Sequence, residues 1–351
     1  MTDVLSDDEI AQRIAALSSR ASTPEYRYFQ PLSMAVDEYE EWATTPEKRI
    51  YLGLEAFDAA MRGTAPGEMT ELVGYTQSGK TLLLTNMMIH NADKSIAWFT
   101  PDETRILVMV RLACVLHGVS AITLEQGLHE HNPEVRRMLN ETAEHFPMLG
   151  VYDDGLDLLQ MLHAMEEQME AVGREPQAIV FDYAALLNHE GDIRGRLEAL
   201  KNFAKNTKKP MFVVQQTSRT TGRDGERIRL ASGEYSGEQQ ATHMIGVRRK
   251  FQYYESLITE IDKKLANPAI KTVDHSELTY ARNEALYLQQ EHQHTITVSL
   301  VKNKRPPAHL VDEIDFHLEA ATGRLLEHRP PEYHDEPLLI RSNRQRLFGD
   351  D

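Results

Sequence analysis

The chain has 351 residues, 41% of them hydrophobic, which is enough for one substantial core and leaves little for a second large domain. Its net charge of −16 argues against a protein coated in nucleic acid, and its single cysteine excludes an intramolecular disulfide and favours a reducing compartment. No apolar run approaches the roughly 20 residues of a membrane span, and residues 1–30 lack the layout of a signal peptide, so we expect a cytoplasmic protein without a membrane partner.

Residues 1–48 are expected to form an N-terminal helical arm. Ile10, Ile14 and Leu17 lie at helical spacing after the candidate helix cap Ser6. One short helix cannot bury such a stripe by itself. The arm is therefore expected to dock on its own core or on a neighbouring subunit.

From residue 51 onward, apolar strands alternate with amphipathic helices, and this alternation predicts an α/β fold with a mostly parallel sheet flanked by helices. The expected strands are 69–73, 95–99, 148–152, 178–181, 211–215, 295–301 and 314–318. The expected helices are 82–90, 104–117, a less regular stretch to 146, 156–172 and 196–206.

Two further helical periodicities lie within about 251–293 and are separated by the breaker Asn267-Pro268. They predict a helical hairpin inserted into the sheet domain, which is expected to span 49–326. The Pro-rich and charged segment 327–351 is expected to be a flexible tail.

Residues 74–81 read GYTQSGKT, a complete G-x-x-x-x-G-K-[ST] phosphate loop between an expected strand and an expected helix. Its glycines let the backbone turn so that successive N–H groups converge on phosphates. Lys80 would reach the β- and γ-phosphates, and the Thr81 hydroxyl would bind Mg²⁺. The sequence therefore predicts a site for ATP and Mg²⁺, and the residues expected to hold the nucleotide are Gly74, Tyr75, Thr76, Gln77, Ser78, Gly79, Lys80 and Thr81.

Polar side chains also follow three other expected strands at their carboxyl ends. Asp182 occupies the position that suits a carboxylate supporting Mg²⁺. Asp102 and Glu103 are adjacent, and one of them would orient and deprotonate the attacking water, while capping of the next helix is the alternative. Gln216, or its neighbour Gln215, would contact the γ-phosphate, the alternative being a solvated amide.

The basic residues concentrate between residues 188 and 250. This segment has 13 Lys and Arg against 7 Asp and Glu, a balance of 13 − 7 = +6, which leaves −22 for the rest of the chain. An acidic body with one basic segment suits a surface or pore that holds DNA. An ordinary solvated charge cluster is the alternative.

Taken in order, the motifs resemble the motor domain of DnaB-type replicative helicases, a branch of the RecA-like ATPases. The matching segments are GYTQSGKT, FTPDETRILVMVR, AIVFDYAALL, VVQQTSR, SGEQQATHMIGVRR and VKNKRPPAHLVDEIDF. The resemblance covers about residues 50–326 and implies a RecA-like fold. It aligns Asp102 with the family's catalytic glutamate and puts Arg111 at the family's offset, so Asp102 or Glu103 is the expected base.

The resemblance also implies roles for basic residues. The family's Lys-x-Arg element, which reaches into a neighbouring subunit's active site, matches the run from Lys302 to Arg305, and the spacing to Phe316 favours Arg305 as the finger with Lys302 or Lys304 beside it. Two loops that line the family's central channel match 188–196 and roughly 218–236. The residues expected to bind DNA are Arg194, Arg196, Arg219, Arg223, Arg227 and Arg229.

The implied function is an ATP-hydrolysing DNA helicase that forms a homo-hexameric ring and translocates on single-stranded DNA during replication. The chain has no room for the family's N-terminal primase-binding domain, which suggests a short, phage-like form acting in the host cytoplasm, with a loader, primase or polymerase as candidate partners. Two alternatives remain, namely a RecA-like recombinase that forms ATP-dependent filaments on DNA, and an ATP-gated loading or switch factor.

Overall fold

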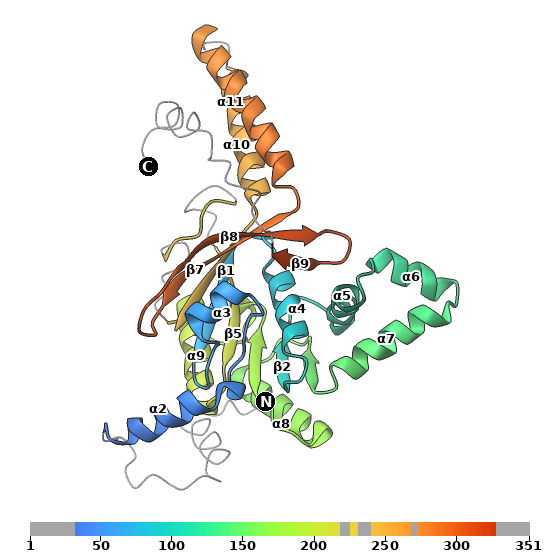
Figure 1. Ribbon diagram of the computed structural model, residues 1–351, viewed down its shortest axis with the longest axis vertical. Helices are drawn as coiled ribbons and strands as arrows, with labels where there is room; N and C mark the ends of the chain where they lie inside the picture. The colour runs from blue at the N-terminus through green and yellow to red at the C-terminus, as the bar shows by residue number, and fades with distance from the viewer. Residues whose placement is uncertain (1–31, 218–224, 231–239, 268–271, 328–351) are drawn as a thin grey trace.

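The computed structural model describes residues 32–217, 225–230, 240–267 and 272–327 (Figure 1). Within these residues the centre is a nine-stranded sheet with the order β3-β2-β4-β5-β1-β6-β7-β8-β9. The parallel part consists of β1 (Met69–Gly74), β2 (Ile96–Phe99), β3 (Leu149–Tyr152), β4 (Ala178–Phe181), β5 (Met211–Gln216) and β6 (His243–Arg248). The antiparallel strands are β7 (Thr295–Asn303), β8 (Val311–Glu319) and β9 (Arg324–Glu327). The expected mostly parallel α/β sheet is confirmed.

The parallel strands are continuous apolar runs because helices cover both faces of the sheet. Leu72, Trp98 and Phe212 belong to one buried core, together with α3 (Glu55–Met61), α4 (Lys80–His90) and α5 (Arg105–His117). Phe181 and Val213 belong to the core on the opposite face, together with α8 (Leu158–Val172) and α9 (Ile193–Thr207). The two cores fix the central strands from both sides.

Two strands were absent from the sequence expectations, namely β6 and β9. β6 carries Gly246 in its middle, where a Cβ would lie 2.7 Å from both the Ile228 Cβ and the Ser299 Oγ. The glycine fits this close packing but interrupts the β-branched run by which a strand is normally recognised. β6 pairs in parallel with β1 and antiparallel with β7, so it joins the two parts of the sheet.

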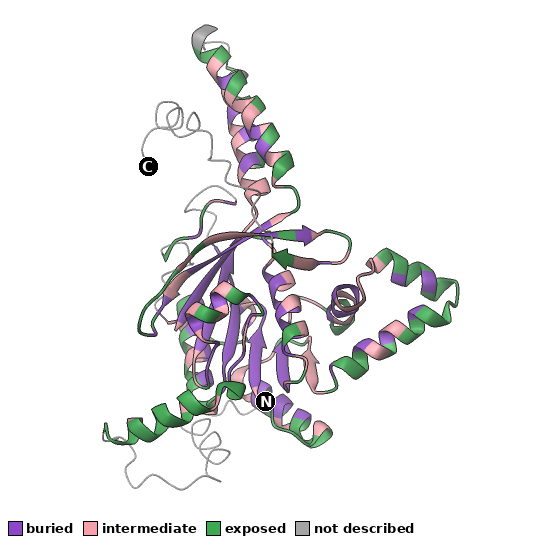
Figure 2. Ribbon diagram, viewed as in Figure 1, coloured by how far each residue is buried: buried purple, intermediate pink, exposed green. Residues whose placement is uncertain are grey.

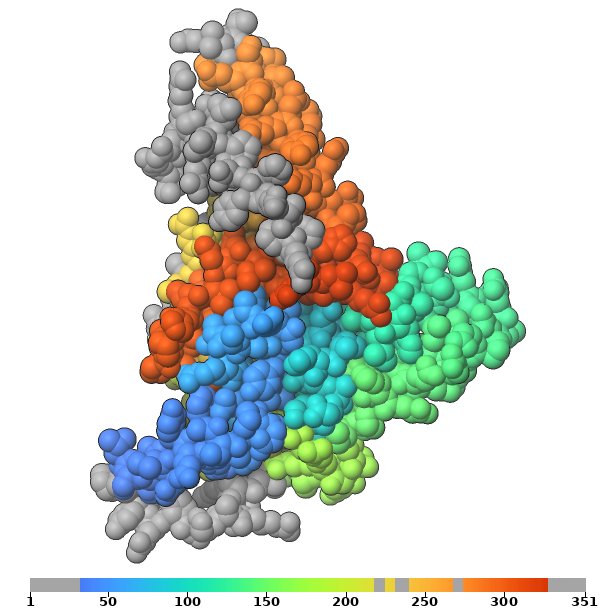
Figure 3. Space-filling model, in the orientation of Figure 1, coloured from blue at the N-terminus to red at the C-terminus, as the bar shows by residue number. Residues whose placement is uncertain are grey.

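A helical projection extends from one side of the sheet, as Figures 1 and 3 show. It consists of α6 (Ala121–His129) and α7 (Pro133–His145), which pack against α5 through a small apolar cluster that includes Cys114. These helices occupy the stretch expected to be less regular. Burial raises the pKa of the Cys114 thiol.

A second projection is formed by α10 (Lys250–Leu265) and α11 (Thr272–Glu291), which lie side by side in the range expected for an inserted hairpin (Figure 1). Tyr254, Ile258, Ala285 and Leu288 form a buried cluster between the two helices. The hairpin thus has an apolar core of its own. Among the described helices, none is individually long and apolar enough to cross a membrane, although α5 and α6, bent by 104°, pass that test as a pair.

The described part of the N-terminal arm consists of α2 (Met34–Thr44) and the 3₁₀ turn η1 (Pro46–Lys48). α2 has no buried residue and is mostly exposed, with Ala35 and Trp42 partly covered (Figure 2). The helix expected around Ile10, Ile14 and Leu17 lies outside the described residues, as does the tail from residue 328.

Candidate nucleotide and DNA site

The phosphate loop joins the carboxyl end of β1 to the amino end of α4. A Cβ on Gly74 would lie 2.1 Å from the Val247 carbonyl oxygen, and a Cβ on Gly79 would lie 2.5 Å from Ile296 Cδ1. Gly79 also has a φ of 98°, in the left-handed region that glycine adopts most easily. Gly74 is therefore required for the close approach of the backbone. Gly79 is required for its left-handed conformation as well as for the close contact.

The ammonium group of Lys80 is buried inside this loop. Its Nζ donates to the carbonyl oxygens of Gly74 at 2.9 Å and Tyr75 at 2.7 Å. Burial lowers the pKa of Lys80 to about 8, although the charge of Asp182 acts in the opposite direction. The loop thus holds a poorly hydrated cation, which an anionic phosphate would stabilise.

Thr81 and Asp182 meet where the α4 amino end faces the end of β4. The Thr81 hydroxyl donates to Asp182 Oδ2 at 2.9 Å. Burial raises the pKa of Asp182 to about 6, and the charge of Glu103 also raises it, whereas Thr81, Lys80 and Arg111 lower it. A hydroxyl and a buried carboxylate are oxygen ligands of the kind that Mg²⁺ binds.

Two buried oxygens next to the loop also fit a phosphate-bearing ligand. Ser78 Oγ and Thr217 Oγ1 have no hydrogen-bond partner within the described chain. The backbone N–H of Thr217 donates to the Gly74 carbonyl at 3.2 Å, so Thr217 lies beside the loop. Buried polar atoms without partners are uncommon and are explained well by a missing ligand or water. These residues fit a nucleotide with Mg²⁺.

Glu103, and not Asp102, lies close to this centre. Glu103 forms a two-point ion pair with Arg111, in which Nη2 and Oε1 are 2.7 Å apart, and both charges act on Asp182. Asp102 is exposed. The helix cap of α5 is Thr104, whose Oγ1 accepts from the Leu107 N–H, so neither carboxylate is the capping residue.

Gln216 ends β5 directly beside Gly74 in the strand register. Its Oε1 accepts a hydrogen bond of 3.4 Å from the Thr76 hydroxyl. A second glutamine, Gln252, contacts the same loop residue, with Nε2 donating to the Thr76 carbonyl at 3.0 Å. Gln252 was missed by the sequence analysis because it belongs to no motif and lies 176 residues beyond Thr76.

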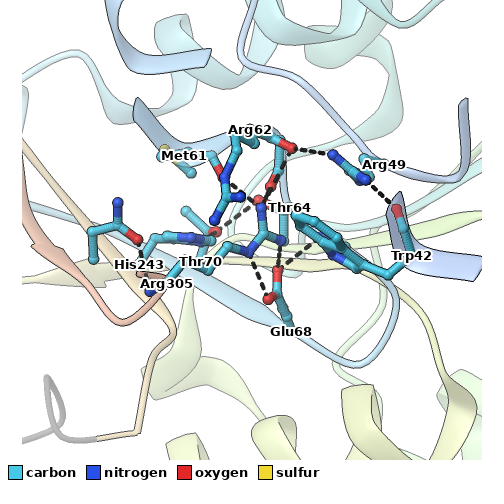
Figure 4. Close-up of polar contacts among 12 residues, drawn as sticks. Trp42, Arg49, Met61, Arg62, Thr64, Glu68, Thr70, His243 and Arg305 are labelled. Atoms are coloured by element: carbon cyan, nitrogen blue, oxygen red, sulfur yellow. Dashed lines mark hydrogen bonds and ion pairs between the residues drawn. The ribbon is translucent and has the colours of Figure 1, made fainter. Parts of the chain in front are cut away.

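Arg305 does not project from its subunit in the way expected of a finger (Figure 4). Its Nε donates to Glu68 Oε1 at 2.9 Å, and Nη1 donates to the carbonyl oxygens of Met61 and, at 2.7 Å, Gly63. The residue is 7% exposed, and its guanidinium lies 5.0 Å from the Trp42 ring centroid. In this conformation these partners occupy the guanidinium inside its own subunit, and the role of Arg305 as a finger stays a prediction.

The spacing that favoured Arg305 also has a structural explanation. Phe316 is a buried residue of β8, paired with Ile296 in the sheet, so its spacing reflects strand packing. Glu68 and Arg305 lie at the amino end of β1, whereas the phosphate loop begins at its carboxyl end, about 20 Å away for a six-residue strand.

The first expected DNA-contacting loop contains arginines with different surroundings. Arg194 lies in the first turn of α9 and is exposed. Arg196 Nε donates to the His189 carbonyl at 3.5 Å, and Nη1 donates to the Ala185 carbonyl. Arg196 therefore holds the segment before α9, and its expected DNA contact stays a prediction.

The second expected DNA-contacting loop is described only in part. Arg227 and Arg229 are exposed, and Arg227 forms a 2.5 Å ion pair with Asp312. Arg219 and Arg223 lie outside the described residues. Among the described residues, Arg194, Arg227 and Arg229 are thus the exposed members of the expected set.

The loop after the central strand requires glycine, and it brings together a buried lysine, a threonine hydroxyl and a strand-end aspartate. These features define a P-loop nucleotide-binding protein. The family model for the DnaB-like helicase C terminal domain matches residues 50–299, and the chain belongs to that family. The resemblance found in the sequence is therefore confirmed.

Relatives agree with this assignment. The replicative DNA helicase DnaB of Treponema pallidum (strain Nichols) is 27% identical over 239 residues, which cover 64% of this chain and 53% of that protein. The chain thus spans about half the length of this relative. A solved ATPase domain has a TM-score of 0.61 and 13% identity, covering 86% of this chain and 99% of its own. The solved structure of a DnaB-like replicative helicase, described with its interactions with primase, has a TM-score of 0.59 and 15% identity, covering 91% and 75% respectively. At these identities the structures support the fold.

Proposed function

We propose that this chain is the motor of a replicative DNA helicase, which hydrolyses ATP with Mg²⁺ and translocates on single-stranded DNA as a homo-hexameric ring. The observation that carries the proposal is the convergence of Lys80, Thr81 and buried Asp182 at one edge of the sheet in a DnaB-like chain. A loader, primase or polymerase is the class of protein partner that we propose, and the cytoplasm is the proposed location.

Each side chain of the site has a proposed role in this reaction. Lys80 would hold the β- and γ-phosphates, Thr81 and Asp182 would hold Mg²⁺, and Gln216 would contact the γ-phosphate. Bound Mg²⁺ supplies positive charge that offsets the charge of the phosphates. Glu103 would accept a proton from the attacking water while Arg111 fixes its carboxylate, which supports Glu103 over Asp102 as the base.

The cation supplied to a neighbouring subunit would be Lys302 or Lys304, because Arg305 is held inside its own subunit. Lys304 is exposed at the end of β7. Lys304→Ala should bind ATP yet turn it over poorly, and should regain partial activity when mixed with Lys80→Ala subunits. If verified mixed assemblies show no recovery, Lys304 is not the trans-acting group. The same experiment is then repeated with Lys302→Ala.

The proposed function is tested by strand displacement on a forked DNA duplex, together with ATP turnover with and without single-stranded DNA. The chain should separate the strands, DNA should stimulate turnover, and Lys80→Ala should lose both activities while remaining folded. Lys263→Ala, an exposed lysine of α10, is the matched control and should retain both. Filaments on DNA without strand displacement would instead support a recombinase, and unstimulated turnover would support a switch factor.

A further inference from the structure

The first turn of α10 contacts the phosphate loop through one side chain. Gln252 Nε2 donates to the Thr76 carbonyl at 3.0 Å, and Gln252 Oε1 is buried without a hydrogen-bond partner in the part of the chain that the structure describes. The Thr76 hydroxyl in turn donates to Gln216. The amide of Gln252 therefore ties the base of the helical hairpin to a residue inside the nucleotide site.

The same turn also contacts the second basic loop, at Gly225. This glycine has a φ of 77°, and a Cβ there would lie 2.4 Å from the Tyr253 nitrogen and 2.7 Å from the Arg249 carbonyl oxygen. Arg248 Nη1 donates to the Gly225 carbonyl at 3.0 Å. Only glycine permits this approach, which fixes the chain two residues before the exposed cation Arg227.

Ion pairs join this turn, and Arg248 at the end of β6 just before it, to β8. Arg248 pairs with Glu313, with Nε and Oε1 2.7 Å apart, and Lys250 pairs with Asp315 at 2.7 Å. Asp315 also accepts a 2.6 Å hydrogen bond from Thr297. The turn is therefore held in place between the phosphate loop and the second basic loop. A displacement of the phosphate loop would reach Gly225 through direct contacts.

We propose that the first turn of α10 couples the nucleotide site to the DNA-binding surface, with Gln252 as the positioning residue. This inference rests on the proposed function. A nucleotide that moves the Thr76 carbonyl changes its hydrogen bond to Gln252, and the turn then changes the position of Gly225 and the cations beyond it. Because such coupling is reciprocal, DNA changes nucleotide affinity by the same factor.

The test is the affinity for a fluorescent single-stranded oligonucleotide, measured with and without a non-hydrolysable ATP analogue and Mg²⁺. The ratio of the two affinities is the coupling factor, which is roughly 5–150-fold in typical allosteric proteins. Gln252→Ala and Gln252→Glu, both unable to donate to Thr76, should lower this factor about fivefold, as expected when one hydrogen bond is removed. Gln290→Ala, an exposed glutamine of α11, should leave it unchanged.

The outcomes separate the inference from the proposed function. A wild-type chain that binds no DNA in either condition contradicts both. If the wild-type coupling factor is well above one and both Gln252 variants keep the same factor, the coupling role of Gln252 is overturned while the proposed function stands. An equal loss of DNA affinity in the two conditions would also overturn it, because a purely structural side chain affects both measurements alike.

Gly225→Ala tests the other contact of the turn independently of Gln252. The added Cβ should displace the loop and lower the coupling factor, provided that thermal unfolding shows a folded protein. A folded Gly225→Ala variant with the full coupling factor would rule out transmission through Gly225. If this variant does not fold, the two Gln252 variants decide the inference.

Discussion

The guanidinium of Arg305 and the carboxylate of Glu68 form an ion pair between residues 237 positions apart, with side chains only 8% and 21% exposed. The pair joins the chain after β7 to the turn before β1. Arg305 also binds carbonyl oxygens at the end of α3 and just after it, so a single side chain holds three segments together at the amino end of the central strand. These contacts give Arg305 a role in the stability of the fold.

Arg305→Ala should lower the free energy of unfolding by about 3–5 kcal/mol, because it leaves Glu68 and several carbonyl groups without their partner. Denaturant unfolding of the purified protein measures this change. Arg194→Ala, at an exposed arginine, should alter stability by no more than about 0.5 kcal/mol. Unchanged stability of Arg305→Ala with a selective loss of ATP turnover would restore the finger assignment.

Glu103→Gln should reduce ATP turnover by about 10²–10⁴-fold while leaving ATP binding intact, because the amide cannot accept the proton of the attacking water. Asp102→Asn is the matched control, since Asp102 is exposed and the Arg111 ion pair is made by the neighbouring carboxylate. Single-turnover kinetics and nucleotide titration separate the two effects. The reverse ranking of the two variants would assign the base to Asp102.

ADP affinity without Mg²⁺ should fall as the pH rises above about 8, by up to tenfold per pH unit, because deprotonated Lys80 no longer attracts phosphate. Burial lowers the pKa of Lys80 in the folded chain, so between pH 8 and its ordinary value near 10.5 the folded state binds fewer protons than the unfolded state. The penalty of the buried charge is therefore relieved and stability rises through this window. Lys80→Arg stays charged and should bind ADP with little pH dependence. If this variant keeps the pH profile of the wild-type protein, Lys80 is not the titrating group.

Replacing Arg194, Arg227 and Arg229 by Ala should weaken binding of single-stranded DNA and flatten its salt dependence, by roughly 0.7 in logarithmic slope for each phosphate that is no longer neutralised. A salt titration of oligonucleotide affinity measures the slope. Arg282→Ala, in the hairpin, is the control and should leave the slope unchanged. An identical slope in the triple variant would remove these arginines from the DNA-binding surface.

The features predictable from sequence were those determined by neighbouring residues. Continuous apolar runs indicated the central parallel strands, and the spacing of Gly74, Gly79 and Lys80 indicated the loop. Arg305 could not be assigned from sequence, because its basic run gives no sign that Glu68 is the partner. The adjacent acids Asp102 and Glu103 were equivalent in sequence, and only the tertiary contact with Arg111 distinguishes them.

The burial of Cys114 has a practical consequence for following movement in this protein. The chain has one cysteine, and its thiol is buried with a raised pKa, so the reactive thiolate is scarce at neutral pH. A maleimide dye should therefore label a cysteine introduced at exposed Tyr287 far faster than Cys114. A single fluorophore can thus report the orientation of the hairpin during turnover while every native core residue is retained.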